Sequence, residues 1–291
     1  MSKKVCVITG CSDGIGKETA VQMASRGYRI GMVVRNSDKS RAAQKEIVER
    51  AKNDAIELFY ADLASQTSVR DVARQLCEAF PAIDILINNA GIVKRSEEIS
   101  DDGIEMTFAV NYIAPVLLTL LLLPTLEKSE AARIINLSSE LYQKGKIDME
   151  NFLTPQKFNG DMAYANSKLL LIHFTVVLAK KLSSKQISVN AIHPGVLGTN
   201  AFREYPRWFT AVLNLFLPKP AEGATRVLKL ATASEFENVN GAYISKTKIQ
   251  NKLKRVFDPA QTIPIWENTL KILEIPDIAD DFSEDSETST R

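Results

Sequence analysis

Cysteine and histidine are scarce in this sequence. Among its 291 residues there are three cysteines, Cys6, Cys11 and Cys77, and two histidines, His173 and His193. An odd number of cysteines without C-x-x-C spacing argues against a disulfide framework, and so few cysteines and histidines leave no set of zinc ligands. We therefore expect reduced thiols, a cytoplasm-like compartment and no metal site.

An excess of charge and a long hydrophobic run are also missing. The 36 basic residues nearly balance the 35 acidic ones, so no global field favours nucleic acid as a partner. The most apolar stretch, Tyr112 to Leu126, is shorter than the ~20 residues of a membrane-spanning helix, and we predict a buried helix there. The amino-terminal "MSKKVCVITG" carries no signal-peptide pattern, which again predicts a cytoplasmic protein.

Six short apolar runs alternate with longer amphipathic segments. The runs are almost continuously apolar, as is typical of parallel strands covered on both faces: Lys4–Thr9, Arg29–Val34, Ala55–Tyr60, Ile83–Asn88, Ala132–Leu137 and Ile187–Ile192. This alternation predicts a single Rossmann-type α/β domain, a doubly wound parallel sheet with helices on both faces. The run "AYISKTK" near Ala242 would supply a further strand, for about seven in all.

The carboxyl terminus changes in character. Residues 277–291, "DIADDFSEDSETSTR", are acidic, rich in Ser and Thr and poor in apolar residues. Such a composition predicts a disordered, solvated tail. We therefore expect one domain over residues 1–276.

A glycine-rich turn follows the first predicted strand and opens a helix. Gly10, Gly14 and Gly16 leave room for backbone N–H groups to approach a pyrophosphate at the positive end of that helix. The spacing G-x-x-x-G-x-G differs from the usual G-x-G-x-x-G, and a turn without a ligand is the alternative. Cys11 lies in the same turn, where the helix start would lower its thiol pKa, but without a resolving cysteine we expect no redox role.

The end of the second predicted strand indicates which dinucleotide would bind. NAD-binding proteins of this architecture hold the ribose hydroxyls there with an acidic residue, whereas this sequence has Arg35 and Asn36. A guanidinium can pair with a 2′-phosphate through its planar fork. The sequence therefore favours NADP(H) over NAD(H), with a merely solvent-exposed arginine as the alternative.

The segment "GDMAYANSKLLLIHF" places Tyr164 and Lys168 four residues apart in a predicted helix. Residues at this spacing share one helix face. A lysine cation beside a phenol favours the phenolate, so we expect Lys168 to lower the pKa of Tyr164 from about 10 and to make it a proton shuttle at neutral pH. Taken alone, the pair is also typical of ordinary helix surface.

Polar residues gather at the predicted carboxyl ends of neighbouring strands. They are Ser138 and Ser139 after the fifth strand, Asn88 to Gly91 after the fourth, and the Pro194–Gly195 turn after the sixth. Asn111, in an apolar helix, needs buried partners. Because ligands bind at this edge of an open α/β sheet, these residues predict one crevice. The alternative for Asn88 is that it only locks the strand end, and we predict His193 to be a core histidine bonded to backbone.

The motifs "TGCSDGIG", "NNAG", Asn111, the Ser pair, "YANSK" and "HPG" extend from roughly Lys4 to Lys248. As a set they resemble the short-chain dehydrogenase/reductase family. The phrases "GIGKETA", "DDGIEMTFAVNYIAPVLLT", "RIINLSS" and "GAYIS" are similar to its retinol dehydrogenase-like branch. The resemblance implies hydride transfer between a nicotinamide and a carbonyl/alcohol pair. Relatives in that branch often carry an amino-terminal membrane anchor, and we expect none here.

The resemblance also implies roles for individual residues. Tyr164 would be the general acid/base, Lys168 its pKa partner and a ribose ligand, Ser139 the holder of the substrate oxygen, and Asn111 the anchor of a water relay. The implied cofactor-binding set comprises Gly10, Ser12, Asp13, Gly14, Ile15, Gly16, Arg35, Asn36, Asp62, Leu63, Asn89, Ala90, Gly91, Pro194, Gly195, Val196 and Thr199, together with Tyr164 and Lys168. Within it, Asp62 would contact adenine and Thr199 the nicotinamide carboxamide.

Substrate choice is expected to depend on a lid at residues 200–223. Its apolar face, with Trp208, Phe209 and Phe216, suits a small apolar carbonyl or alcohol substrate of the retinoid, steroid or lipid-aldehyde type, or peripheral contact with a membrane. Packing on its own domain or on a dimer partner is the alternative, and both a monomer and a homo-oligomer stay open. Two other function classes remain. One is a cofactor-binding scaffold without catalysis; the other is a sugar-nucleotide epimerase or dehydratase, which would need a larger second domain after "HPG".

Overall fold

The computed structural model describes residues 3–149, 151, 153–154, 157–195, 219–250 and 259–278. The strands are β1 (Val5–Thr9), β2 (Arg29–Val34), β3 (Ile56–Tyr60), β4 (Ile85–Asn88), β5 (Ala132–Leu137), β6 (Ile187–His193), β7 (Tyr243–Ser245) and β8 (Lys248–Ile249). The α-helices are α1 (Gly14–Ala24), α2 (Asp38–Ala51), α3 (Gln66–Ala79), α4 (Met106–Phe108), α5 (Ala114–Leu126), α6 (Gly160–Lys181), α8 (Pro220–Thr232) and α9 (Pro259–Leu273). A π-helix, Ala109–Ile113, joins α4 to α5, and 3₁₀ helices cover Glu140–Lys144 and Ser234–Phe236.

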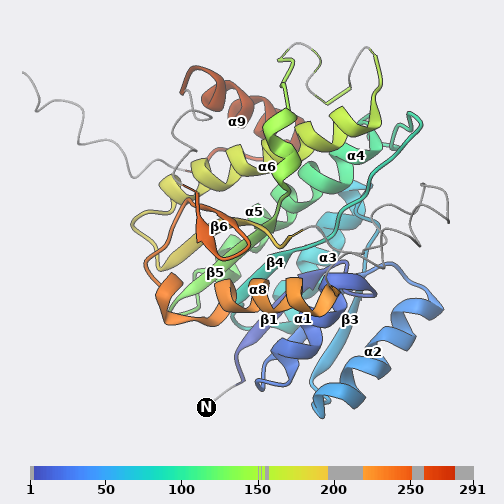
Figure 1. Ribbon diagram of the computed structural model, residues 1–291, viewed down its shortest axis with the longest axis vertical. Coiled ribbons are helices and arrows are strands. Elements are labelled where there is room, and N and C mark those ends of the chain that lie inside the picture. The colour runs from blue at the N-terminus through green and yellow to red at the C-terminus, as the bar shows by residue number, and fades with distance from the viewer. Residues whose placement is uncertain are drawn as a thin grey trace, which may run out of the picture.

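These strands form one sheet in the order β3-β2-β1-β4-β5-β6-β7-β8 (Figure 1). β1 to β7 pair in parallel, and the order reverses between β1 and β4, which is the switch point where open α/β sheets bind ligands. The predicted Rossmann-type doubly wound fold is confirmed. The strand count needs a correction, because "AYISKTK" forms two short strands: β7 ends at Ser245, and β8 returns antiparallel to it.

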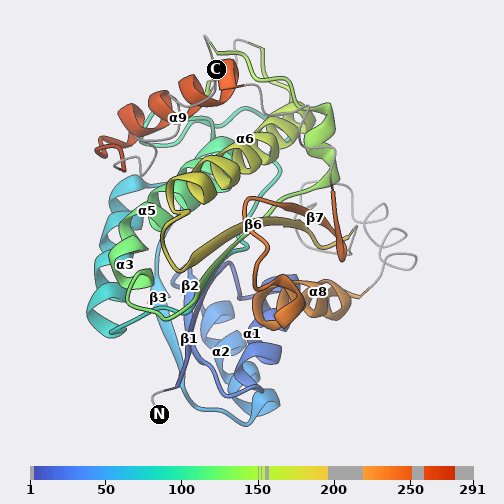
Figure 2. The ribbon, with the colours of Figure 1, turned by 90° about the vertical axis from the view of Figure 1, so that its left-hand side faces the viewer.

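Helices cover both faces of the sheet because consecutive strand residues point to opposite sides. In β1, Val5 and Val7 pack into the core under α3, α5 and α6, while Cys6 and Ile8 pack into the core under α1, α2 and α8. Figure 2 shows the two layers on either side of the sheet, with α9 lying outside α6. Both faces of each central strand are therefore buried, which explains the continuous apolar runs of the sequence.

Side chains placed just before the helices start them. Asp13 precedes α1 and accepts the Gly14 N–H, Ser37 precedes α2, Ser65 precedes α3, and Asn159 precedes α6 and accepts the Met162 N–H. Each side-chain oxygen satisfies one N–H that the first helical turn leaves unpaired. The loops after β1, β2 and β3 therefore end at fixed points close to the carboxyl edge of the sheet.

Two helical segments are long and apolar enough to cross a membrane: Met106–Leu126 and Gly160–Lys181. In the protein, 83% and 72% of their most apolar stretches are buried, as in the core helices of a folded domain. α5 contains most of the apolar stretch from Tyr112 to Leu126, and it lies against α3 and the sheet. The prediction of a buried helix there is confirmed.

A series of hydrogen bonds between buried amides and hydroxyls links β4 and β5 to the helices α5 and α6. Asn88 Nδ2 donates to Asn136 Oδ1 (2.8 Å) and to Thr119 Oγ1 (3.0 Å), and Asn136 Nδ2 donates to Thr175 Oγ1 (2.9 Å). These bonds join β4 and β5 to α5 and α6. Asn88 thus locks the end of its strand, which was one of its two predicted roles.

The last described helix, α9, closes the outer side of α6. Trp266 stacks on Phe174 with ring centroids 6.1 Å apart, and its Nε1 donates to Asp277 Oδ1 (2.8 Å). Lys181 Nζ lies 5.4 Å from the Trp266 ring centroid and donates to Asp277 Oδ2 (3.2 Å). Asp277, the first residue of the predicted tail, is thereby tied to α6 and α9, whereas residues 279–291 lie outside the described part of the chain.

Acid is expected to destabilise this contact through His173. Its Nδ1 lies 3.2 Å from Thr262 Oγ1 between α6 and α9, and burial lowers the pKa of His173 from 6.5 to about 4. The unfolded chain therefore binds this proton at higher pH than the folded chain. Stability is retained above the unfolded pKa and lost as the pH falls toward the folded pKa, by on the order of 2 to 3 kcal/mol.

Urea unfolding of the wild type at about pH 7 and about pH 5 measures this loss. His173→Asn, which removes the titrating group, should lose less stability over the same interval. An equal loss in both proteins would assign the acid sensitivity to other groups.

Candidate active site

A cavity of about 860 Å³ opens at the carboxyl ends of the strands. Its walls come from the loops after β1 to β6 and from α6. The predicted residues that line it are Gly10, Ser12, Asp13, Gly14, Ile15, Gly16, Arg35, Asp62, Leu63, Asn89, Ala90, Gly91, Ser139, Tyr164, Lys168, Pro194 and Gly195. Asn36 and Asn111 are not among the lining residues, and Val196 and Thr199 lie outside the described part of the chain.

At its three glycines the turn brings bare backbone to the start of α1, beside the Asp13 side chain that caps the helix. Gly10 has φ +67° and Gly14 has φ +56°, values that favour glycine. A Cβ on Gly16 would lie 2.3 Å from Asn89 Nδ2 and 2.7 Å from the Gly10 carbonyl oxygen. Asn89 Nδ2 in turn donates to the carbonyls of Thr9 (2.8 Å) and Gly10 (3.1 Å), fixing the turn against the loop after β4. This backbone cradle fits a pyrophosphate at a helix N-terminus.

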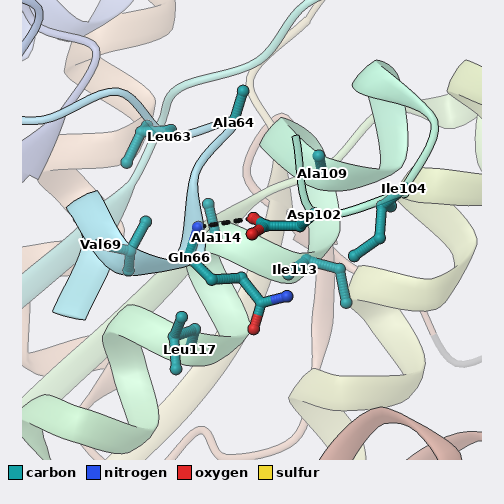
Figure 3. A pocket seen from close by; sticks show the side chains of 10 residues that line it. All are labelled: Leu63, Ala64, Gln66, Val69, Asp102, Ile104, Ala109, Ile113, Ala114 and Leu117. Carbon is teal, nitrogen blue, oxygen red and sulfur yellow. Dashed lines mark hydrogen bonds between the residues drawn. The ribbon is translucent and has the colours of Figure 1, made fainter. Parts of the chain in front are cut away.

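The loop after β3 is held by two carboxylates. Asp62 Oδ1 accepts the Ala64 N–H (3.0 Å), and Asp102 Oδ2 accepts the Gln66 N–H (2.7 Å) at the start of α3. Figure 3 shows Asp102 reaching this N–H beside Leu63 and Ala64, in a hollow closed by apolar side chains. Leu63 and Ala64 also line the large cavity. Asp102 does not line it, but its hydrogen bond to Gln66 helps to hold the loop that carries these two residues.

Two cations lie near the end of β2. Arg35 is exposed at the cavity wall, and its guanidinium has no ion-pair partner among the described residues. Lys39 Nζ forms an ion pair with Asp13. The Asn36 side chain accepts a hydrogen bond from Arg41 Nη1 (2.7 Å) and stands outside the cavity. No carboxylate occupies the position after β2 that would hold ribose hydroxyls.

Ser139, Tyr164 and Lys168 meet beyond the end of β5. Ser139 lies close enough to Tyr164 for hydrogen bonding that lowers the pKa of the phenol. Ser139 Oγ also accepts the Leu141 N–H (3.3 Å), which starts the 3₁₀ helix Glu140–Lys144. Lys168, only 4% exposed, donates from Nζ to the Leu137 carbonyl (2.9 Å) and lies 5.6 Å from the Tyr164 ring centroid. The wall opposite Lys168 is Gly91, where a Cβ would come within 3.3 Å of Nζ.

The pKa of Tyr164 is shifted in the direction opposite to the one expected from the sequence. Burial raises the pKa of Tyr164, and the hydrogen bond with Ser139 opposes that rise. Burial also lowers the pKa of Lys168 to about 8. Desolvation is the dominant cause of the Tyr164 shift, and the Lys168 ammonium points to the Leu137 carbonyl. The phenol therefore holds its proton at neutral pH.

Asn111 lies in the π-helix and ties three segments together. Its Nδ2 donates to the Ile92 carbonyl (2.9 Å) and to Ser167 Oγ (3.1 Å), and its Oδ1 accepts the Ile92 N–H (2.8 Å). Both amide hydrogens are thus engaged. Ser167 Oγ donates onward to the Tyr164 carbonyl (2.8 Å), so Asn111 fixes the turn of α6 that carries Tyr164. The predicted water relay through Asn111 stays a prediction.

The turn after β6 is held from α8. Arg226 Nη1 donates to the Pro194 carbonyl (2.5 Å), and Gly195 has φ +110°. A Cβ on Gly195 would lie 2.4 Å from Arg226 Nη1, so the guanidinium occupies the space that a side chain would need. Most of the predicted lid, including Trp208, Phe209 and Phe216, lies outside the described part of the chain. The description resumes at Lys219.

Two sequence expectations in this region were wrong. Burial raises the pKa of Cys11 to about 12, and its Sγ donates to the Ile8 carbonyl (3.3 Å). His193 lines the cavity, and its Nε2 has no hydrogen-bond partner among the described residues, so it is not a satisfied core histidine.

Sequence reasoning also missed charged residues that line the cavity. Glu140 follows Ser139, and Lys94 forms an ion pair with Glu98 (2.5 Å). The signal for Glu140 was available: a charged residue directly after a predicted catalytic serine, in a loop at the site edge.

The sequence match to known families covers this same architecture. The family model described as short chain dehydrogenase matches residues 4–209, which is most of the chain. The chain therefore belongs to the short-chain dehydrogenase/reductase family, and it is an oxidoreductase that acts on CH–OH groups.

Within the family the chain falls in the retinol dehydrogenase-like branch. Human retinol dehydrogenase 13 is 35% identical over 287 residues, covering 94% of this chain and 86% of that protein. Human polyprenol dehydrogenase is 30% identical over 286 residues, with the same two coverages. A short chain dehydrogenase from Burkholderia cenocepacia, solved in complex with NADP, has a TM-score of 0.68 at 28% identity, covering 83% of this chain and 95% of that one.

Proposed function

We propose that this protein is an NADP(H)-dependent oxidoreductase that interconverts a carbonyl and an alcohol on a predominantly apolar substrate, with Tyr164 as its acid/base. The observation that carries the proposal is the meeting of Ser139, Tyr164 and Lys168 in a cavity that begins at the glycine turn. Proteins of the retinol dehydrogenase-like branch are named for retinol and polyprenol, and this supports an apolar alcohol or carbonyl substrate.

The residues present fit a dinucleotide. The turn at Gly10, Gly14 and Gly16 would hold the pyrophosphate, Asp62 and Leu63 would flank the adenine, and Arg35 would pair with the 2′-phosphate. Gly91 leaves Lys168 Nζ open to a ribose. The NADP held by the related Burkholderia cenocepacia structure supports the choice of NADP over NAD.

A bound nicotinamide would supply or accept the hydride. In the reductive direction Ser139 would donate a hydrogen bond to the substrate oxygen, and Tyr164 would give that oxygen its proton. The raised pKa of Tyr164 keeps this proton in place at neutral pH. Lys168 would stabilise the tyrosinate left behind, and the bonds of Asn111 to Ile92 and Ser167 would keep the helix turn of Tyr164 from moving.

The lining of the cavity includes the apolar residues Ile92, Val93, Met106, Val110 and Leu141. Apolar residues in these positions support a substrate whose body is apolar. The free thiols of Cys6, Cys11 and Cys77 support a cytoplasmic location. Peripheral contact with a membrane would involve residues 206–218, which lie outside the described part of the chain.

Arg35→Ala is expected to remove the preference for NADPH. The guanidinium is exposed and lines the cavity without an ion-pair partner among the described residues, so a 2′-phosphate would gain a charge-assisted pair there. Its loss should weaken NADPH binding by about 10- to 100-fold while leaving NADH binding nearly unchanged. Quenching of tryptophan fluorescence, titrated with each nucleotide, gives the ratio of the two dissociation constants.

Arg41→Ala is the matched control. This arginine is also exposed near the end of β2, but its guanidinium contacts Asn36 and Asp38 and does not line the cavity. The NADPH/NADH ratio should persist in this variant. A wild type that binds both nucleotides equally, or a ratio that survives Arg35→Ala, would contradict the assignment of Arg35. If neither nucleotide bound, the glycine-turn interpretation itself would fail.

A further inference from the structure

Among the described residues, pairing within the sheet holds β6 as far as His193. On one side the Lys246 N–H donates to the His193 carbonyl (2.8 Å). On the other side the register of β5 with β6 ends at Leu137 and Ile192. The next residue, Pro194, has no N–H with which to continue a ladder. It is nevertheless buried and lines the cavity, so its carbonyl needs a partner from outside the sheet.

Arg226 of α8 supplies that partner. Its Nη1 donates to the Pro194 carbonyl (2.5 Å), and its Nη2 lies 3.6 Å from Glu222 Oε2, one helical turn earlier on α8. The guanidinium also fills the space beside Gly195, where a Cβ would come within 2.4 Å of Nη1. Glu222 thus helps to orient the planar guanidinium, and the guanidinium holds both residues of the turn.

α8 is itself firmly held, so it can act as a fixed support. Its residues Val227, Leu228 and Leu230 are buried in the core shared with α1 and the sheet. α8 packs beside α1 (Figure 2), and Gln22 of α1 donates from Nε2 to the Ala221 carbonyl (3.1 Å) at the start of α8. Since α1 begins at the glycine turn, a guanidinium carried on α8 places the turn after β6 relative to the pyrophosphate end of the cavity.

The supported turn adjoins the end of the cavity where the reaction would take place. Leu137 of β5 is the register partner of Ile192 of β6, and the Ser138 N–H donates to the Ile192 carbonyl (2.8 Å). Ser139 and Pro194 each follow this pair by two residues, and both line the cavity. Neighbouring strands lie only about 4.8 Å apart. A shift of the turn would therefore change the shape of the cavity beside Ser139.

We propose that Arg226 is a positioning residue for hydride transfer: by holding the Pro194 carbonyl, it fixes the wall of the cavity at which the nicotinamide and the substrate come together. Arg226 is not among the residues that line the cavity, so it acts through the turn. Small displacements of reacting groups are costly in rate, because transfer needs a close and aligned approach. This inference rests on the proposed function and adds a residue to its mechanism.

The expected effect is confined to the nicotinamide half of the cofactor. Arg226→Ala should weaken the binding of NADPH by about 10-fold and lower kcat for ketone reduction by about 10- to 100-fold. The adenosine half would bind at the glycine turn and Arg35, so the affinity for adenosine 2′,5′-bisphosphate should be unchanged. Calorimetric titration with each ligand gives the two dissociation constants, and initial rates of NADPH oxidation with an apolar ketone give kcat.

Two rescue measurements separate positioning from a general loss of stability. Guanidinium ion, added to Arg226→Ala at a low, non-denaturing concentration, should restore part of kcat, whereas sodium chloride at equal ionic strength should not. Arg226→Lys, which can still donate to the Pro194 carbonyl but lacks the planar fork, should have a kcat between those of the wild type and Arg226→Ala.

Arg133→Ala is the matched control. Arg133 also donates from Nη1 to carbonyls, those of Leu230 and Ala233 at the other end of α8, and it is not among the residues that line the cavity. Its loss should lower the free energy of unfolding, measured in urea, and leave kcat and NADPH binding nearly unchanged.

An Arg226→Ala protein with wild-type kcat and wild-type NADPH affinity would overturn the inference. So would an equal weakening of NADPH and of the bisphosphate, or the same kinetic loss in Arg133→Ala, because either result would assign the effect to general destabilisation. If the wild type bound NADPH but reduced no ketone, the proposed function would be in error, and the ratio of the two affinities would still decide the role of Arg226. A wild type that bound neither ligand would overturn both.

Discussion

Replacing Tyr164 by phenylalanine is expected to lower kcat for ketone reduction by about 10²- to 10⁴-fold, the usual contribution of a positioned general acid. The substitution removes one hydroxyl that bonds to Ser139 and leaves the ring and the surrounding helix in place. Initial rates of NADPH oxidation with an apolar ketone measure the effect. NADPH binding, followed by tryptophan fluorescence, should change far less than the rate.

The pH dependence of the wild type follows from the same residue. Because burial raises the pKa of Tyr164, its hydroxyl keeps the proton needed for reduction throughout the neutral range. The rate should therefore persist through neutral pH and fall only on the alkaline side. Since the pKa of Lys168 is lowered to about 8, the lysine charge is lost before the tyrosine proton.

Tyr28→Phe is the matched control for this prediction. It makes the same chemical change just before β2, at the end of the sheet remote from the cavity, and should leave kcat nearly unchanged. A Tyr164→Phe protein with wild-type turnover would remove Tyr164 from the chemistry. A wild type that binds NADPH but reduces no ketone would favour the catalytically silent scaffold.

Truncating Trp266 to alanine is expected to cost about 3 to 5 kcal/mol of unfolding free energy, as large aromatic truncations in cores do. The indole is 5% exposed, stacks on Phe174, donates to Asp277 and lies under the Lys181 ammonium. Its removal would leave a cavity between α6 and α9 and remove one partner of the Asp277 carboxylate, which would keep its contact with Lys181. Because α6 carries Tyr164 and Lys168, loosening it should also lower activity at elevated temperature.

Ile263→Ala supplies the comparison on the same helix. Ile263 is 55% exposed, so its truncation should change the unfolding free energy by no more than about 0.5 kcal/mol. Urea unfolding of both variants measures the difference. Similar losses in the two variants would mean that α9 contributes helix stability in general and that the Trp266 contact is not special.

The sequence was sufficient for the features that depend on continuous burial. Ranges such as Arg29–Val34 and Ala132–Leu137 were predicted to the residue, because both faces of those strands are covered and most of their side chains are apolar. β8 was not predicted because it lacks this burial. Its two residues, Lys248 and Ile249, are exposed, so neither burial nor alternation leaves a mark on them.

The positions of site residues were predictable where a motif fixes the backbone conformation. The pKa shifts were less predictable, because they depend on a balance between desolvation and nearby charges. Gly10, Gly14 and Gly16 could be placed because only glycine meets their geometric demands. The pKa direction of Tyr164 could not, since it depends on where the Lys168 ammonium points and how deeply both groups lie. The cavity-facing position of His193 was equally inaccessible: it follows from strand register with Ser245, a contact between segments 52 residues apart (193 to 245).

The short strand β8 has a consequence for how the molecule behaves in a crowded solution. A sheet that ends in a long, flat, apolar strand offers unpaired N–H and C=O groups on which another chain can grow into an aggregate. Within the described part of the chain, the sheet ends on that side in two exposed residues, one of them a lysine. Such an edge gives a foreign strand little backbone to template on and places a hydrated charge in its path. The apolar parallel strands behind it are thereby protected from being extended by a second chain.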